Sequence, residues 1–131
     1  MTELDLGDGL RLLNEVKTGD HFGHESHLRF AWVLLDEASS VDNAEHVANL
    51  TIRHVAEVGG NSGKYNCTAT IFWIRLLAHV RETNKGVTTL DEALEAWPDL
   101  RDPLLPNRHW SNINSAEAKQ RWVEPDLLPL P

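Results

Sequence analysis

The sequence predicts an all-α fold, a compact single domain of about five to six helices around a buried central helix, with an irregular, proline-rich C-terminal tail. Apolar residues recur at helical spacing in successive segments, and glycine or proline separates those segments. One segment, 64–83, is apolar nearly all round. A chain of 131 residues with 41% hydrophobic residues can bury one core, so we expect a single domain, 1–131.

The first three helices are predicted from apolar stripes and end signals. Leucines at helical spacing indicate a short first helix that ends near residues 18–19, although two glycines weaken its first turn. The third helix, 41–58, has Ser40 in position for an N-cap and Gly59 and Gly60 at its end. The second helix, 24–38, carries an apolar stripe of Leu28, Ala31, Trp32 and Leu35.

The segment 64–83 is the strongest helix candidate and should form the centre of the bundle. It follows a polar loop at 61–63 and is hydrophobic on nearly every face, which is typical of a buried helix. Its β-branched residues would also suit a buried strand, but the segment is too long for one.

The last part of the chain is less regular. Thr89 and Glu92 form a capping-box pattern for a short helix that Pro98 ends. Another short helix is predicted after Ser115 and ends near residue 123. The tail, 124–131, contains too much proline for a helix, and its leucines indicate that it packs along the body.

Composition excludes several classes of partner. The formal net charge is −8, from 12 Lys and Arg against 20 Asp and Glu, and the basic residues are scattered, so we expect no nucleic-acid binding. Cys67 is the one cysteine, so no intrachain disulfide can form, and we expect it to be buried. With no signal-peptide pattern and no apolar stretch long enough for a bilayer, we expect a cytoplasmic protein with no membrane partner. The sequence is compatible with a homo-oligomer.

The first candidate site is a histidine pair on the second helix. His24 and His27 are three residues apart and share a face with the apolar stripe, so both rings should point toward the core. Polar rings on a buried face need partners, and paired histidines can bind a metal or act as acid and base near neutral pH. The alternative is that both rings are structural, since this spacing alone is a weak motif.

The second candidate site opens the central helix. Lys64 falls in its predicted first turn, where the helix dipole disfavours a cation, which indicates an anionic or polar partner. The alternative is a lysine that reaches toward solvent and a tyrosine that belongs to the core. The polar candidates for this site are Lys64, Tyr65, Asn66 and Thr68, with Arg29 from the second helix.

Three segments resemble the motifs of one family. Residues 22–32 (FGHESHLRFAW) resemble F-x-H-x-x-H-L-R-x-A-W, residues 64–70 (KYNCTAT) resemble K-Y-H-x-T-x-T, and the C-terminal residues resemble S-x-E-A and P-D-L-x-P-L-P. These are the motifs, in the same order, of an uncharacterised bacterial family of small helical proteins. The resemblance implies no activity, but it implies that the first two segments form one site. Asn66 stands where the motif has histidine, which weakens a three-histidine metal site and favours proton transfer.

The leading hypothesis is a small-molecule enzyme with a pocket between helices 24–38 and 64–83. His24, His27 and Tyr65 would be catalytic, in acid–base chemistry of the lyase, dehydratase, cyclase or isomerase type. We expect no cofactor. The residues expected to bind the substrate are Lys64, Asn66, Thr68 and Arg29.

Two other hypotheses come from the same residues. In the first, His24 and His27 bind a divalent metal, and His21, Glu25 or His109 supplies a third ligand, although Glu25 projects away from both histidines. In the second, the protein is a non-catalytic module that binds a small molecule or another protein, and the histidines only stabilise the fold.

Overall fold

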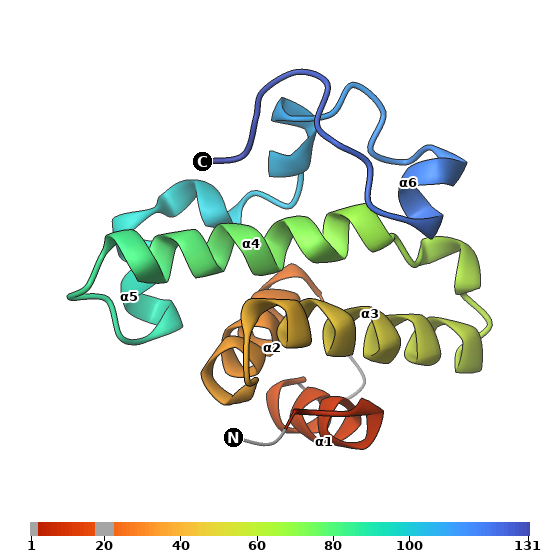
Figure 1. Ribbon diagram of the computed structural model, residues 1–131, viewed down its shortest axis with the longest axis horizontal. Helices are drawn as coiled ribbons and strands as arrows, with labels where there is room; N and C mark the ends of the chain where they lie inside the picture. The colour runs from red at the N-terminus through yellow and green to blue at the C-terminus, as the bar shows by residue number, and fades with distance from the viewer. Residues whose placement is uncertain (1–2, 18–22) are drawn as a thin grey trace.

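The computed structural model describes residues 3–17 and 23–131, and these residues form helices and no strand, as predicted. Figure 1 shows α4 crossing the molecule, with α1, α2 and α3 on one side of it and the C-terminal segment on the other. The α-helices are α1 (Leu6–Val16), α2 (His24–Glu37), α3 (Val41–Val58), α4 (Cys67–Thr83), α5 (Leu90–Ala96) and α6 (Ala116–Gln120). Three short 3-10 helices join them: η1 (Ser62–Lys64), η2 (Pro98–Arg101) and η3 (Leu105–Arg108).

Side-chain caps fix where most helices begin. Ser40 and Ser115 accept hydrogen bonds from the third backbone N–H of α3 and α6, and Thr89 and Glu92 form the predicted capping box of α5. Asn66 caps α4 in the same way through the backbone N–H of Ala69. These boundaries are therefore marked by hydrogen bonds within the local sequence.

Two predicted boundaries are wrong. The central helix begins at Cys67 rather than at residue 64, because Asn66 caps it and the chain before Asn66 forms the separate turn η1. Lys64 therefore ends η1 and does not lie in the first turn of α4, so the argument from the helix dipole does not apply to it. The last helix ends at Gln120 rather than near residue 123, and Arg121 is already extended.

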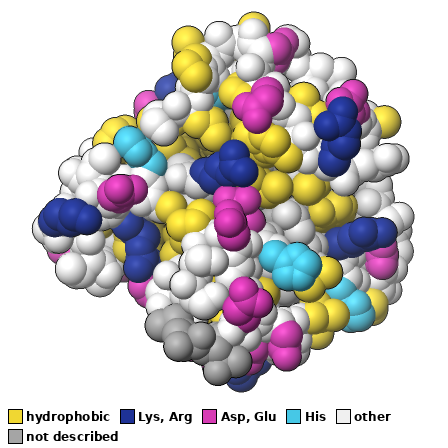
Figure 2. Space-filling view, viewed as in Figure 1, with side chains coloured by type: hydrophobic (Ala, Val, Ile, Leu, Met, Phe, Trp, Pro, Cys, Tyr) yellow, Lys and Arg dark blue, Asp and Glu magenta, His cyan; other side chains and the backbone are white. Residues whose placement is uncertain are grey.

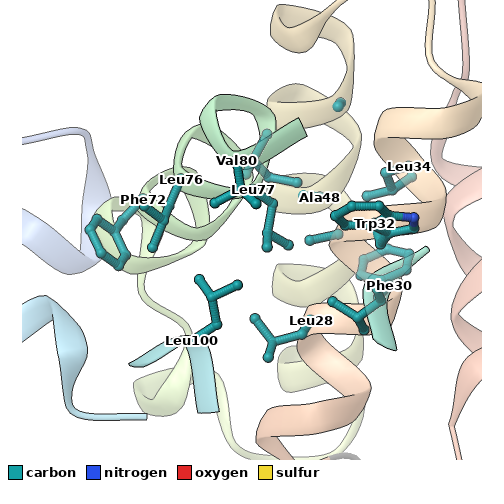
Figure 3. Packing of buried hydrophobic residues seen from close by; sticks show 14 of the residues in the cluster. Leu28, Phe30, Trp32, Leu34, Ala48, Phe72, Leu76, Leu77, Val80 and Leu100 are labelled. Carbon is teal, nitrogen blue, oxygen red and sulfur yellow. The ribbon is translucent and has the colours of Figure 1, made fainter. Parts of the chain in front are cut away.

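The core surrounds α4, which packs against α2, α3 and α6. Phe72, Leu77 and Val80 of α4 are completely buried. Figure 3 shows Leu77 and Val80 among side chains of α2 and α3, with Leu100 of η2 below them. Other buried core residues include Leu28, Phe30, Trp32 and Leu34 of α2, more of that helix than the predicted stripe.

Helices α1 and α3 make an unusually close approach at Gly9. A Cβ atom at Gly9 would lie 2.0 Å from Oγ1 of Thr51 and 2.9 Å from Cγ1 of Val47. The Thr51 side chain is completely buried, and its hydroxyl donates to the Val47 carbonyl over 2.7 Å. Gly9 does more than weaken the first turn of α1, because only glycine leaves room for α3.

The C-terminal segment packs along the body, as predicted. The indole N–H of Trp110 donates to the Val123 carbonyl over 2.9 Å, and the Ser111 hydroxyl donates to the Asp126 carboxylate over 2.5 Å. Further along, the Leu127 N–H donates to the His109 carbonyl. The segment that follows α6 is thereby tied to the residues after η3.

Charged side chains are mixed over the surface. Figure 2 shows acidic and basic groups interspersed on one face, with no continuous basic stripe on that face. Several of them pair along a helix, such as Arg11 with Glu15 and Arg53 with Glu57, and exposed pairs of this kind add little stability. In the described part of the chain, no helix combines the length and apolar character needed to cross a membrane.

Candidate functional site

A pocket of about 330 Å³ lies between α2 and α4, where the two candidate segments meet. The histidine pair comes from the first turn of α2, and Lys64 and Asn66 come from the chain that leads into α4. The lining residues are Gly23, His24, His27, Ile52, Lys64, Asn66, Ala69, Thr70, Trp73 and Pro103.

His24 is held at the pocket wall by a segment far away in the sequence. Its Nε2 lies 2.8 Å from the carbonyl oxygen of Leu100 in η2. A carbonyl can only accept, so Nε2 carries the proton, and Nδ1 of the neutral ring is an acceptor. The ring also contacts Trp73 edge-on, with centroids 4.8 Å apart. These two contacts fix both the tautomer and the orientation of the imidazole.

His27 lies about one turn further along α2 in a more enclosed position. Burial lowers the pKa of His27 to about 4, and the neighbouring His24 adds to this effect. At neutral pH the His27 imidazole is therefore uncharged. The prediction that both rings point into the core is met only in part, since each is half-buried at the edge of the pocket.

The described lining of the pocket carries a positive side chain, whereas the protein as a whole is strongly negative. Lys64 is the one Lys or Arg among its described lining residues, and none of these lining residues is Asp or Glu. The chain as a whole has 20 acidic and 12 basic residues. The lining therefore departs from the overall charge and favours an anionic group near Lys64.

Asn66 lines the pocket, but its side chain mainly organises the structure. Its Oδ1 accepts from the Ala69 N–H over 2.9 Å, and its Nδ2 donates to the Ile113 carbonyl over 2.8 Å. The second bond ties the start of α4 to the segment before α6. Asn66 thus positions the chain between Lys64 and α4, and one of its two amide N–H groups is used in doing so.

Tyr65, predicted to be catalytic in the pocket between α2 and α4, does not line it. It lines a different cavity of about 540 Å³, together with Arg53 and Lys119. Its hydroxyl donates to Oδ1 of Asn49 over 2.8 Å. Burial, with a contribution from the Cys67 thiol, raises the pKa of Tyr65, so it remains protonated at neutral pH. Cys67 itself is half-buried rather than buried.

Thr68 and Arg29 also lie away from the pocket that they were predicted to serve. Thr68 is completely buried, and its hydroxyl donates to the Arg121 carbonyl over 2.7 Å and accepts from the Val123 N–H over 3.2 Å. Arg29 pairs with Glu25 and with Asp91 of α5, and these bonds raise its pKa. Thr68 connects α4 with the segment after α6, and Arg29 connects α2 with α5.

Of the three candidates for a third metal ligand, the two that the structure describes, Glu25 and His109, do not join the histidine pair. His21 lies outside the described residues. Glu25 is exposed and paired with Arg29, and His109 lies against Phe72 with its Nδ1 donating to the Leu128 carbonyl. Within residues 3–17 and 23–131, no group of three His, Cys, Asp or Glu side chains is arranged to hold a metal ion.

Sequence reasoning missed several residues of the site. Thr70 and Trp73 lie four and seven residues after Asn66, so helical spacing alone could have placed them on its face. Ile52 and Pro103 line the pocket, and Leu100 orients His24, but all three come from distant segments. No local signal in the sequence connects those segments with the histidine pair.

No protein-family model matches this sequence, and neither a curated protein nor a solved structure matches it. The pocket is therefore interpreted from its own geometry and chemistry.

Proposed function

We propose that this protein is a small-molecule enzyme of the lyase, dehydratase, cyclase or isomerase type, in which His24 and His27 carry out acid–base chemistry in the pocket between α2 and α4. One observation carries the proposal: two imidazoles of α2 line the same pocket in different environments. Two groups of one kind in different surroundings are typical of an acid–base pair.

The two histidines have different roles in this proposal. His24 is the base, because its hydrogen bond to the Leu100 carbonyl leaves the lone pair on Nδ1. His27 stays neutral at pH 7 and forms the hydrogen bond to a substrate oxygen on which negative charge develops.

The chemistry then follows for two of these reaction types, isomerisation and dehydration. His24 removes a proton from a carbon of the substrate, and the released electron pair moves toward the oxygen held by His27. In an isomerisation, the proton returns to another atom of the substrate. In a dehydration, it goes to the leaving hydroxyl, which departs as water. In both cases His24 ends in its starting state, and no external oxidant or reductant is needed.

The proposal is tested by exchange of substrate protons with solvent. A panel of small 2-oxo and 3-hydroxy acids, with their amides, is incubated with the protein in D₂O and followed by proton NMR. We expect deuterium to enter at least one compound, and His24→Gln to slow that exchange by about 10²–10⁴-fold. His46→Gln is the matched control, because His46 is exposed on α3. Exchange that is equally fast in His24→Gln would refute the base role. No exchange with the whole panel would favour the non-catalytic binding module.

Elemental analysis of the purified protein tests the metal-dependent alternative. Stoichiometric metal in the unmodified protein that disappears in His24→Ala would give His24 the role of a ligand instead of a base.

A further inference from the structure

A small recess adjoins the pocket between α2 and α4 and shares part of its wall. This recess has a volume of about 30 Å³, and His27, Ile52, Thr70 and Trp73 line both spaces. The recess is otherwise lined by apolar side chains, namely Phe30, Ala31, Ala48 and Ile74. A cavity with such walls favours an apolar group over water.

The size of the recess limits what it can hold. A single water-sized group needs about 10–15 Å³ of this kind of volume, so the recess has room for about two or three such groups. Methyl and methylene groups are larger than water, so the recess accepts one or two carbon atoms. The outer pocket, at about 330 Å³, is at the small end of the range for ligand sites. Together they fit a compact molecule with a short apolar end.

The charge of the lining defines the opposite end of the ligand. Lys64 is exposed and lines the outer pocket but not the recess. Among the described lining residues it is the one side chain with a permanent positive charge, and none of these residues is acidic. One such charge matches a ligand with a single negative charge, whereas phosphate esters are usually held by several cations or bidentate arginines.

From this polarity we infer that the ligand is a small monocarboxylate, with its carboxylate at Lys64 and an apolar end of one or two carbons in the recess behind His27. The inference deepens the proposed function and rests on it, since it names the substrate class of the same pocket. In this orientation the middle of the molecule passes the two histidines. There the carbon next to a 2-oxo group can lose a proton to His24, and the electron pair moves to the oxo oxygen held by His27.

Binding is tested without any turnover. Acetate, propionate, butyrate and hexanoate are titrated into the full chain, and the indole N–H signal of Trp73 and the histidine ring signals are followed by NMR. We expect affinity on the order of 1 mM, rising from acetate to butyrate and falling for hexanoate. The neutral amides should bind at least about tenfold more weakly, as expected for loss of one charged contact.

Variants separate the two ends of the ligand. Lys64→Met should weaken carboxylate binding by about tenfold, whereas Lys85→Met, at an exposed position between α4 and α5, should leave it unchanged. Ile74→Val enlarges the recess and should move the preferred chain one carbon longer. Ala48→Val fills the recess and should move it one carbon shorter.

The outcomes are distinct. Equal affinity for acids and amides, no effect of Lys64→Met, or tighter binding of inorganic phosphate than of butyrate would overturn the inference. Carboxylate binding with this preference, without deuterium exchange, would support the inference and refute the catalytic role. Exchange that occurs equally in acids and amides would refute the inference while the proposed function stands.

Discussion

Replacing Gly9 by alanine tests how the helices of this bundle are placed. The new Cβ would lie 2.0 Å from Oγ1 of Thr51, a separation that real Cβ atoms do not show, so α1 must move away from α3 by about an ångström or more. Thr51 has little freedom to give way, because it is completely buried and bonded to the Val47 carbonyl.

The expected loss follows from two opposing effects. Overpacking a close contact costs about 1–3 kcal/mol, and this overlap belongs at the upper end. Alanine regains about 0.5–1 kcal/mol over glycine inside a helix. We therefore expect Gly9→Ala to lower the free energy of unfolding by about 2 kcal/mol, measured by urea denaturation with an unchanged slope.

A second substitution makes the reasoning refutable. Thr51→Ala removes the clashing oxygen, so Gly9→Ala combined with Thr51→Ala should be more stable than the sum of the two single effects predicts, by about 1–2 kcal/mol. Gly86→Ala is the control, because a Cβ there meets nothing within 4 Å. The steric explanation fails if Gly9→Ala unfolds at the same urea concentration as the unmodified protein, or if the double variant shows no recovery.

Three further predictions concern polar groups that are buried or half-buried. Thr68→Val leaves the Arg121 carbonyl and the Val123 N–H without their shared partner, so it should lower the free energy of unfolding by about 1–3 kcal/mol. Thr83→Val, at an exposed helix end, is the control and should change the free energy of unfolding by less than about 0.5 kcal/mol. Asn66→Asp keeps the cap of α4 but places an oxygen against the Ile113 carbonyl, so the free energy of unfolding should fall by about 1–2 kcal/mol in the same denaturation assay. An unchanged free energy of unfolding would contradict the role of the bond to Ile113. Between pH 6.5 and 4 the unfolded chain binds a proton at His27 that the folded chain does not. The free energy of unfolding should therefore fall by up to about 3 kcal/mol as the pH is lowered through this window. His27→Gln should remove that part of the pH dependence.

Most of the helices could be predicted because their signals are local. The capping box of Thr89 and Glu92 and the caps at Ser40 and Ser115 satisfy the first N–H groups of each helix wherever the helix lies in the fold. The close approach at Gly9 could not be predicted, since its reason lies in Thr51 on another helix. From the sequence alone, that glycine only appeared to weaken α1.

The site was predicted where one helix face determines it and missed where the helix phase was wrong. His24 and His27 both line the pocket because they share a face of α2. Arg29 comes five residues after His24, about 140° further round the helix, so spacing alone places it elsewhere. Tyr65 and Thr68 would share a face only in a continuous helix, and the extended backbone at Tyr65 and Asn66 breaks that phase.

The partner of His24 is a main-chain carbonyl, and this has a consequence for the evolution of the pocket. Any amino acid at position 100 supplies the same oxygen, so no substitution there deletes the acceptor outright. In an alignment of relatives, His24 would show no covarying partner despite its dependence on a residue 76 positions away. An insertion or deletion in η2 would shift the backbone and remove the contact between His24 and the Leu100 carbonyl. Selection to retain this contact would therefore be visible as a fixed length of the 98–101 turn and not as a fixed residue.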